Sequence, residues 1–104
     1  MTLEDRRLKL HERFCSILGS RYVYYDPPET ITMHYPAIVY NKARVYMRHA
    51  DNIKYLGRVA YTATLIRKDD DDDILDRLLL MPYTSYDRPM TANNLHHDTF
   101  TVYI

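Results

Sequence analysis

The stretch that decides the fold is residues 37–67, AIVYNKARVYMRHADNIKYLGRVAYTATLIR. It opens on the apolar run 37–40, which is typical of a buried strand, and apolar and polar side chains alternate in the runs that follow. Strand periodicity predicts that Val45 and Met47 share one face and that the other face holds Arg44, Tyr46 and Arg48. Between the runs, Ala50-Asp51-Asn52 is typical of a turn. The segments 37–49 and 53–67 therefore predict a long antiparallel hairpin.

Upstream of the hairpin, residues 2–18 predict an amphipathic helix. Its apolar side chains recur at helical spacing and form one stripe: Leu3, Leu10, Phe14, Ile17 and Leu18. Thr2 can cap the start together with Asp5, and Gly19 suits the left-handed stop that ends many helices. Between helix and hairpin, residues 21–25 have the composition of a strand.

Downstream of the hairpin, the aspartates 69–73 precede a short second helix over 74–81, which Pro82 ends. The expected buried stripe of this helix is Ile74, Leu75, Leu78 and Leu79. The remaining expectations are a short extended piece at 83–86, a loop at Arg88-Pro89, a turn at Asn93-Asn94 and a closing strand at 99–104. The fold class is α+β: one domain, residues 1–104, with a mixed, mainly antiparallel sheet flanked by an N-terminal helix and a second short helix.

Composition narrows the class of protein. The only cysteine is Cys15, so no internal disulfide is expected, and a reducing compartment fits. The N-terminus is charged where a signal peptide would be apolar, and no apolar run approaches a membrane span, so we expect a soluble intracellular protein without a membrane partner. The 14 basic and 14 acidic side chains balance, which argues against a general nucleic-acid binder and suits a subunit that assembles.

Tyrosine is unusually frequent, with eleven Tyr against two Phe and no Trp. Tyrosine has a large apolar ring and a hydroxyl that tolerates water, so it is enriched at subunit interfaces. High β-propensity explains the same composition equally well.

The aspartates 69–73 are the most conspicuous local feature, but they do not match a calcium loop. That loop needs glycine at its sixth position, which here is Ile74. Contiguous side chains also diverge, so convergence on one ion is not expected. The alternatives are a solvated loop with an acid that caps the helix, or an acidic patch that faces a partner.

Other candidate sites carry weaker patterns. His96 and His97 are adjacent on a strand, so they point to opposite faces, and a third ligand would have to come from elsewhere, such as His34 or His49. Cys15 has no visible base or activating charge and is expected to be half-buried and inert. Two glycines in the whole chain leave no phosphate-binding loop. We therefore expect no catalytic residue, no cofactor and no metal, and a protein that is not an enzyme.

Four further stretches share a pattern with a known family: residues 17–28 (ILGSRYVYYDPP), 34–40 (HYPAIVY), 61–69 (YTATLIRKD) and 81–95 (MPYTSYDRPMTANNL). Through them the chain, from about residue 10 to the end, resembles the small tail-terminator (tail-completion) proteins of long-tailed bacteriophages. The resemblance implies an α+β sandwich subunit of a ring, usually a hexamer, that caps the last ring of the tail tube. The ring stops tube polymerisation and offers the docking surface for the connector of the head. The aspartate run is longer than the family pattern.

The resemblance implies several partners. They are further copies of the chain, the tail tube protein and a head-completion or connector protein, in a virion assembled in the host cytoplasm. DNA would pass through the lumen without specific binding. The expected interface or lumen residues are Asp70, Asp71, Asp72, Asp73, Tyr46, Tyr55 and Arg48. If the four aspartates face the lumen, they keep it repulsive to phosphates, and neutralising them should leave DNA stuck. Normal infectivity of that variant would contradict the lumen hypothesis.

Three other functions remain open. A head-completion or connector-stopper subunit also forms rings. A small enzyme or ligand-binding domain would use His96, His97 and the aspartate run in a concave pocket. A recognition module would stay monomeric and add an extended peptide to an exposed sheet edge.

Overall fold

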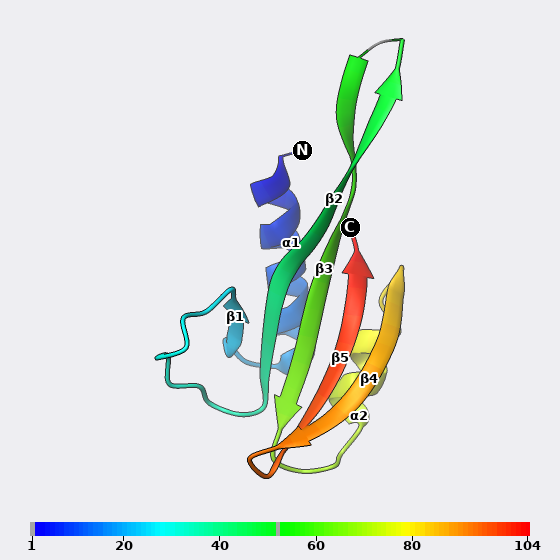
Figure 1. Cartoon of the computed structure of the whole chain (residues 1–104). Coiled ribbons are helices and arrows are strands. Elements are labelled where there is room, and N and C mark those ends of the chain that lie inside the picture. The colour runs from blue at the N-terminus through cyan, green and yellow to red at the C-terminus, as the bar shows by residue number, and fades with distance from the viewer. Residues whose placement is uncertain (1, 52) are drawn as a thin grey trace.

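The computed structural model describes residues 2–51 and 53–104, with the side chain of Tyr55 left out. Within these residues the chain forms two helices and five strands, in the order α1 (Leu3–Leu18), β1 (Val23–Tyr25), β2 (Ala37–Ala50), β3 (Ile53–Arg67), α2 (Asp73–Leu79), β4 (Thr84–Ala92) and β5 (Leu95–Tyr103). The strands lie in one sheet in the order β1-β2-β3-β5-β4, with β1 parallel to β2 and the other pairs antiparallel (Figure 1). This is the α+β fold that the sequence predicts.

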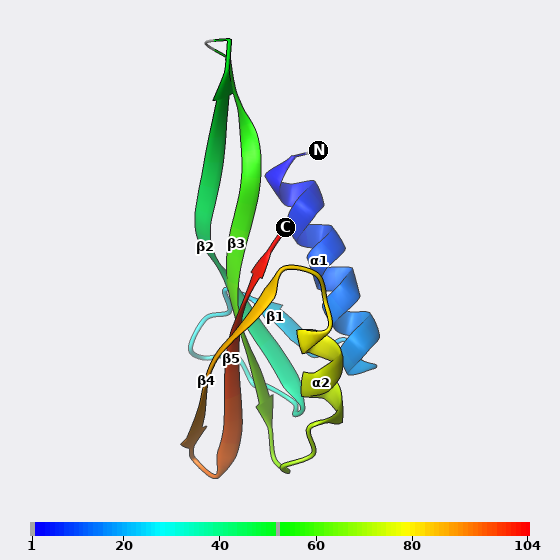
Figure 2. The same cartoon turned by 90° about the vertical axis from the view of Figure 1, so that its right-hand side faces the viewer.

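Both helices pack on the same face of the sheet, so the molecule has two layers (Figure 2). The core lies between the layers, where the apolar stripe of α1 meets alternate residues of β2, β3 and β5. Its largest fully buried side chains are Tyr40, Tyr61, Phe14, Phe100, Leu10, Ile38, Leu65 and Leu78. The aromatic rings pack edge to face, with Phe14 and Tyr40 at 5.3 Å and Tyr40 and Tyr61 at 6.0 Å between ring centroids.

The N-terminal helix α1 forms as predicted, including both of its ends. The backbone N–H of Asp5 donates to Thr2 Oγ1 at 3.1 Å, and the N–H of Thr2 donates to Asp5 Oδ2 at 3.0 Å, which completes a capping box. These bonds lower the pKa of Asp5. Gly19 ends the helix with φ 78°, a left-handed conformation that glycine adopts without strain.

The predicted hairpin of β2 and β3 is confirmed, and it extends well beyond the rest of the sheet. β1 pairs with β2 only as far as Tyr40, and the partner residues of β3 on the C-terminal strand begin at Val59 and Ala60. We call residues 41–58, which continue past these neighbours, the arm. The arm projects from the body in Figures 1 and 2, and the molecule is 52 Å long but only 27 and 23 Å across. At about 3.3 Å per residue, its strands reach roughly 30 Å.

The register of β2 and β3 shifts twice along the arm, which the strand pattern of residues 42–49 did not predict. The Arg44 guanidinium over the Tyr46 ring agrees with the predicted shared face of these two residues. The shifts lie between Lys42 and Arg44 and between Val45 and Met47. Gly57 lies opposite the second shift, where a Cβ atom would be only 2.7 Å from the carbonyl oxygen of Tyr46. Such bulges bend and twist a strand pair. They give the arm a fixed twist that the sequence pattern did not reveal.

The C-terminal third differs from the prediction in three places. β4 continues through Arg88-Pro89, where we expected a loop, because proline is tolerated in an edge strand. β5 begins at Leu95 and lies between β3 and β4, so the histidines are not at a sheet edge. α2 ends at Leu79, two residues before the predicted end. The predicted turn at Asn93-Asn94 is confirmed, with φ 53° and 61°.

Candidate functional site

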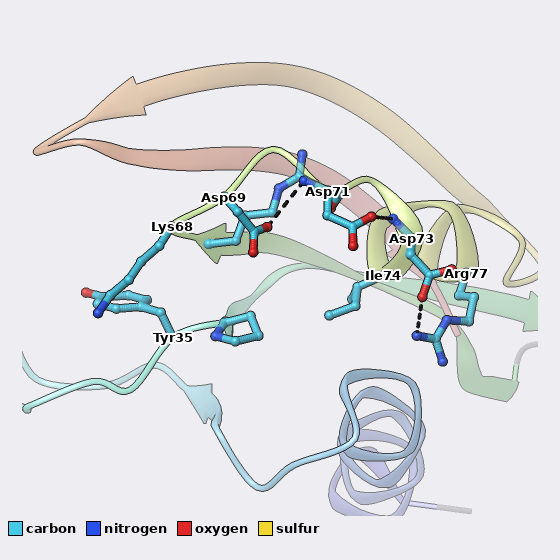
Figure 3. Close-up of a pocket in the computed structure, with 9 residues that line it drawn as sticks. Tyr35, Lys68, Asp69, Asp71, Asp73, Ile74 and Arg77 are labelled. Atoms are coloured by element: carbon cyan, nitrogen blue, oxygen red, sulfur yellow. Dashed lines mark hydrogen bonds and ion pairs between the residues drawn. The ribbon is translucent and has the colours of Figure 1, made fainter.

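The aspartate run forms a loop that is tied to the sheet by one buried cation. We call residues 69–73 the acidic loop; it connects β3 to α2 (Figure 3). Arg67 at the end of β3 is 5% exposed, and its guanidinium donates to Asp98 Oδ2 at 2.7 Å, to Asp72 Oδ1 at 2.8 Å and to the carbonyl oxygen of Asp71. Two residues of the acidic loop are therefore held in place by a cation of the sheet.

Asp98 extends this cluster into a hydrogen-bond network between side chains of β3, β5 and β4. It is 5% exposed on β5, and its Oδ1 accepts a 2.8 Å bond from the hydroxyl of Tyr86 on β4. Burial of that hydroxyl and its bond to Asp98 raise the pKa of Tyr86 to about 12. Burial acts to lower the pKa of Arg67, but the hydrogen bond to Asp72 and the charges of both aspartates raise it. The network keeps Arg67 ionised and Tyr86 neutral at any physiological pH.

The other aspartates shape the acidic loop itself. Asp69 Oδ1 accepts from the backbone N–H of Asp71 at 3.2 Å, and Asp71 Oδ1 accepts from the N–H of Asp73 at 3.1 Å. Asp72 stands at the N-cap of α2 but its side chain makes no capping bond, and its carboxylate accepts from Arg67 instead. Asp73 pairs with Arg77 at 2.7 Å on the surface of the helix.

The acidic loop still presents charge to solvent beside a cavity. The side chains of Asp70, Asp73 and Asp72 are 81%, 68% and 62% exposed. The cavity has a volume of about 330 Å³ and lies between the acidic loop, the start of α2 and the segment that precedes β2. Its lining residues are Tyr35, Pro36, Arg67, Lys68, Asp69, Asp71, Asp73, Ile74 and Arg77 (Figure 3). Within residues 2–51 and 53–104, no group of three His, Cys, Asp or Glu residues could hold a metal ion.

The arm carries the most exposed apolar side chains of the hairpin. Tyr46 is 40% exposed, Met47 is 50% exposed and Ile53, beside the turn, is 65% exposed. Tyr46 and Arg48, two of the predicted interface residues, lie on the arm; the side chain of Tyr55, a third, falls outside the described ones. A second hollow, about 380 Å³, lies at the root of the arm between Tyr46, Met47, Arg48, Arg58 and Tyr103.

The root of the arm is braced by the helix layer and the C-terminus. Arg6 of α1 donates to the carbonyl oxygen of Gly57 and, at 3.4 Å, to that of Ile104. The ring centroids of Tyr46 and Tyr103 lie 6.4 Å apart. The guanidinium of Arg44 lies over the Tyr46 ring, 5.5 Å from its centroid. The arm is therefore fixed at its base and free along its length.

Charge is segregated along the molecule although the total is zero. The arm holds five Lys and Arg residues and one acid, Asp51, whereas residues 67–77 hold six Asp against three Lys and Arg. The arm and the acidic loop lie at opposite ends of the long axis (Figure 1). A count by segment would have found this imbalance in the sequence, but only the fold places the two segments at opposite ends.

The structure does not bring the other candidate residues together. His97 Nδ1 lies 3.2 Å from the carbonyl oxygen of Leu95, while His34 stacks on Tyr22 with ring centroids 5.0 Å apart. Cys15 is half-buried, as predicted, and burial raises the pKa of its thiol, so it is a poor nucleophile. Sequence reasoning placed Asp98 only beside His96 and His97 and missed both its pairing with Arg67 and the role of Tyr86, because the pairing of the strands alone brings these residues together.

No helix in the described part of the chain has the length and apolar character needed to cross a membrane. Comparison of the chain with models of protein families, with curated proteins and with solved structures found no match.

Proposed function

We propose that the chain is a virion structural protein of the tail-terminator type. Copies of it form a ring, hexameric by resemblance, that caps the tail tube, stops its polymerisation and provides the surface on which the head docks. The support from sequence is the resemblance of residues 17–28, 34–40, 61–69 and 81–95 to that family. The α+β fold is of the class that the resemblance implies.

The arm is the structural observation that carries the proposal. A ring is built from a heterologous contact, in which one patch of a subunit meets a different patch of the next. The arm reaches away from the body and holds Tyr46, Met47 and Ile53 in exposed positions. A monomer gains nothing from exposing such side chains on a projecting hairpin, whereas a subunit that reaches its neighbour buries them.

The experiment that tests the proposal is deletion of the gene from the phage that carries it, with electron microscopy of the lysate. We expect overlong, irregular tails beside filled heads that have not joined, and a return of normal particles when the wild-type gene is supplied in trans. Tails of normal length would contradict the tail-terminator function. If such tails accompany empty or unjoined heads, the connector-stopper function replaces it.

A variant of the acidic loop tests in the same experiment whether this loop faces the lumen. Supplying the gene with Asp70→Asn and Asp73→Asn neutralises two exposed carboxylates and leaves unchanged the three residues that accept hydrogen bonds from Arg67: Asp71, Asp72 and Asp98. Retained DNA in particles of otherwise normal shape would support a lumen position for the acidic loop. Normal infectivity would remove the acidic loop from the lumen and leave it available as an interface.

A further inference from the structure

We propose that the arm of one copy docks on the end of a second copy that holds the acidic loop. This inference rests on the proposed ring and names the contact between its subunits. Its occupant is a second copy of the chain, recognised by opposite charge at the two ends of one molecule.

The arm has both edges and apolar side chains without cover. In the described part of the sheet, the outer edge of β2 has no partner strand beyond Tyr40, and the outer edge of β3 has none before Val59. Unpaired edges invite pairing with another chain, and natural proteins cover them or make them charged. Tyr46, Met47 and Ile53 add exposed apolar surface to these edges. We therefore expect a binding partner to cover these strand edges and apolar side chains of the arm.

Charge determines what covers it. Two arms would bring five Lys and Arg residues, against one acid, onto an identical set, and like charges that face each other disfavour the contact. The complementary set lies on the same chain, at residues 67–77, where Asp outnumber Lys and Arg six to three. Opposite patches steer two copies together in this one orientation.

The acidic end offers more than charge. Its cavity of about 330 Å³ has apolar walls at Tyr35, Pro36 and Ile74 beside the aspartates. The end of the arm has the matching mixture, with apolar Ile53 next to basic Lys54, both exposed. Arg67 lines the same cavity, where Asp98 and Asp72 already balance its charge, so the exposed aspartates remain free to meet the basic arm.

Charge-reversal variants test the contact in sedimentation experiments from micromolar to millimolar concentration. The first is Arg48→Glu with Lys54→Glu on the arm, and the second is Asp70→Lys with Asp76→Lys at the acidic end; all four residues are exposed and none binds Arg67 closely. A matched control is Lys9→Glu with Arg13→Glu, which reverses two exposed charges on α1. We expect the wild type to associate more weakly as salt rises, because the contact is electrostatic.

The dissociation constant of each charge-reversal variant should rise at least about tenfold. The arm variant loses the net positive charge of its arm, and the other variant loses the net negative charge of its acidic end, so neither keeps two attracting patches. The control should associate as the wild type does. An equimolar mixture of the two variants should regain association, because the unaltered basic arm of the second variant meets the unaltered acidic end of the first. A zero-length carbodiimide cross-link between Lys54 of one isotope-labelled copy and an aspartate of an unlabelled copy would locate the contact.

Three results would overturn the inference. The first is a wild type that stays monomeric at millimolar concentration and low salt. The second is a pair of charge-reversal variants that associate as the wild type does. The third is a wild type that binds duplex DNA in a salt-dependent way, with the arm variant losing DNA binding and not self-association. Failure of the ring is a different result: a closed pair in which each arm docks on the other copy would uphold the contact and contradict the proposed ring.

Discussion

Arg67 and Asp98 are 31 positions apart in the chain and meet at 2.7 Å on the helix-covered side of the sheet, each 5% exposed. Their pairing fixes where β3 ends and where the acidic loop turns back toward α2. A buried ion pair is worth little relative to apolar packing, but breaking one side of it leaves an unpaired buried charge. This asymmetry makes Asp98 the most sensitive position outside the apolar core.

Asp98→Ala should lower the free energy of unfolding by about 1.5–3 kcal/mol, because Arg67 would lose its buried partner and keep only Asp72 and the carbonyl oxygen of Asp71. Urea unfolding followed by circular dichroism measures this. The matched control is Asp73→Ala, which removes an exposed pair with Arg77 and should change stability by about 0.5 kcal/mol or less. Equal effects of the two substitutions would mean that burial does not distinguish the pairs.

Tyr86→Phe should change how stability depends on pH at alkaline values. The pKa of Tyr86 is raised to about 12 in the folded chain, above its ordinary value of 10, so the folded state holds the phenolic proton more tightly. The resulting stabilisation is fully present below pH 10 and is lost as pH rises through 12. The wild type should therefore lose more stability than Tyr86→Phe over this range. Tyr83→Phe, at a 63% exposed ring, is the control and should follow the wild type.

Gly57→Ala should disturb the arm while leaving the core intact. The new Cβ would lie 2.7 Å from the carbonyl oxygen of Tyr46, so backbone must shift at the second bulge, at a cost of about 1–3 kcal/mol. Amide hydrogen exchange should quicken along residues 41–58 and stay slow in β5. Gly19→Ala provides the contrast. Its new Cβ would meet no atom within 4 Å, but the left-handed backbone at this position disfavours alanine. This substitution should therefore lower the free energy of unfolding without a local effect on the arm.

His11 should titrate below the ordinary histidine value. Burial and the nearby charge of Arg7 lower its pKa, and its Nδ1 lies 2.7 Å from the hydroxyl of buried Tyr40. Because the folded state disfavours the protonated ring, the related stability is present above pH 6.5 and is lost as pH falls through the lowered pKa. An NMR titration of the His11 ring protons measures the midpoint directly. A midpoint at or above 6.5 would contradict the burial of the His11 ring beside Arg7.

The sequence predicted those elements whose ends are set by contacts between residues close together in the chain. Thr2, Asp5 and Gly19 define the ends of α1 by contacts within a few residues, and the apolar pattern of 37–67 is sufficient to predict the hairpin. Pro89 was misread, because whether proline ends a strand depends on whether that strand lies at a sheet edge, which the local sequence does not reveal.

The candidate site depended on contacts that cross the chain. Asp98 meets Arg67 only after β3 and β5 pair in register, and Tyr86 joins them only through β4. The sequence marked the aspartates as conspicuous but could not separate Asp72, which serves Arg67, from Asp70, which is 81% exposed. The length of the arm was also hidden, because it is set by where the neighbouring strands stop.

Tyrosine, including the rings packed around Tyr40, determines the ultraviolet fluorescence of the protein. Tyr25 and Tyr61 lie 5.0 and 6.0 Å from Tyr40 between ring centroids, and the chain holds no tryptophan. Its native ultraviolet emission is therefore that of tyrosine alone. Met47→Trp, at a position that is 50% exposed on the arm, would introduce the single tryptophan of the chain. Its emission wavelength would then report whether the arm stands in water or is covered, without any label.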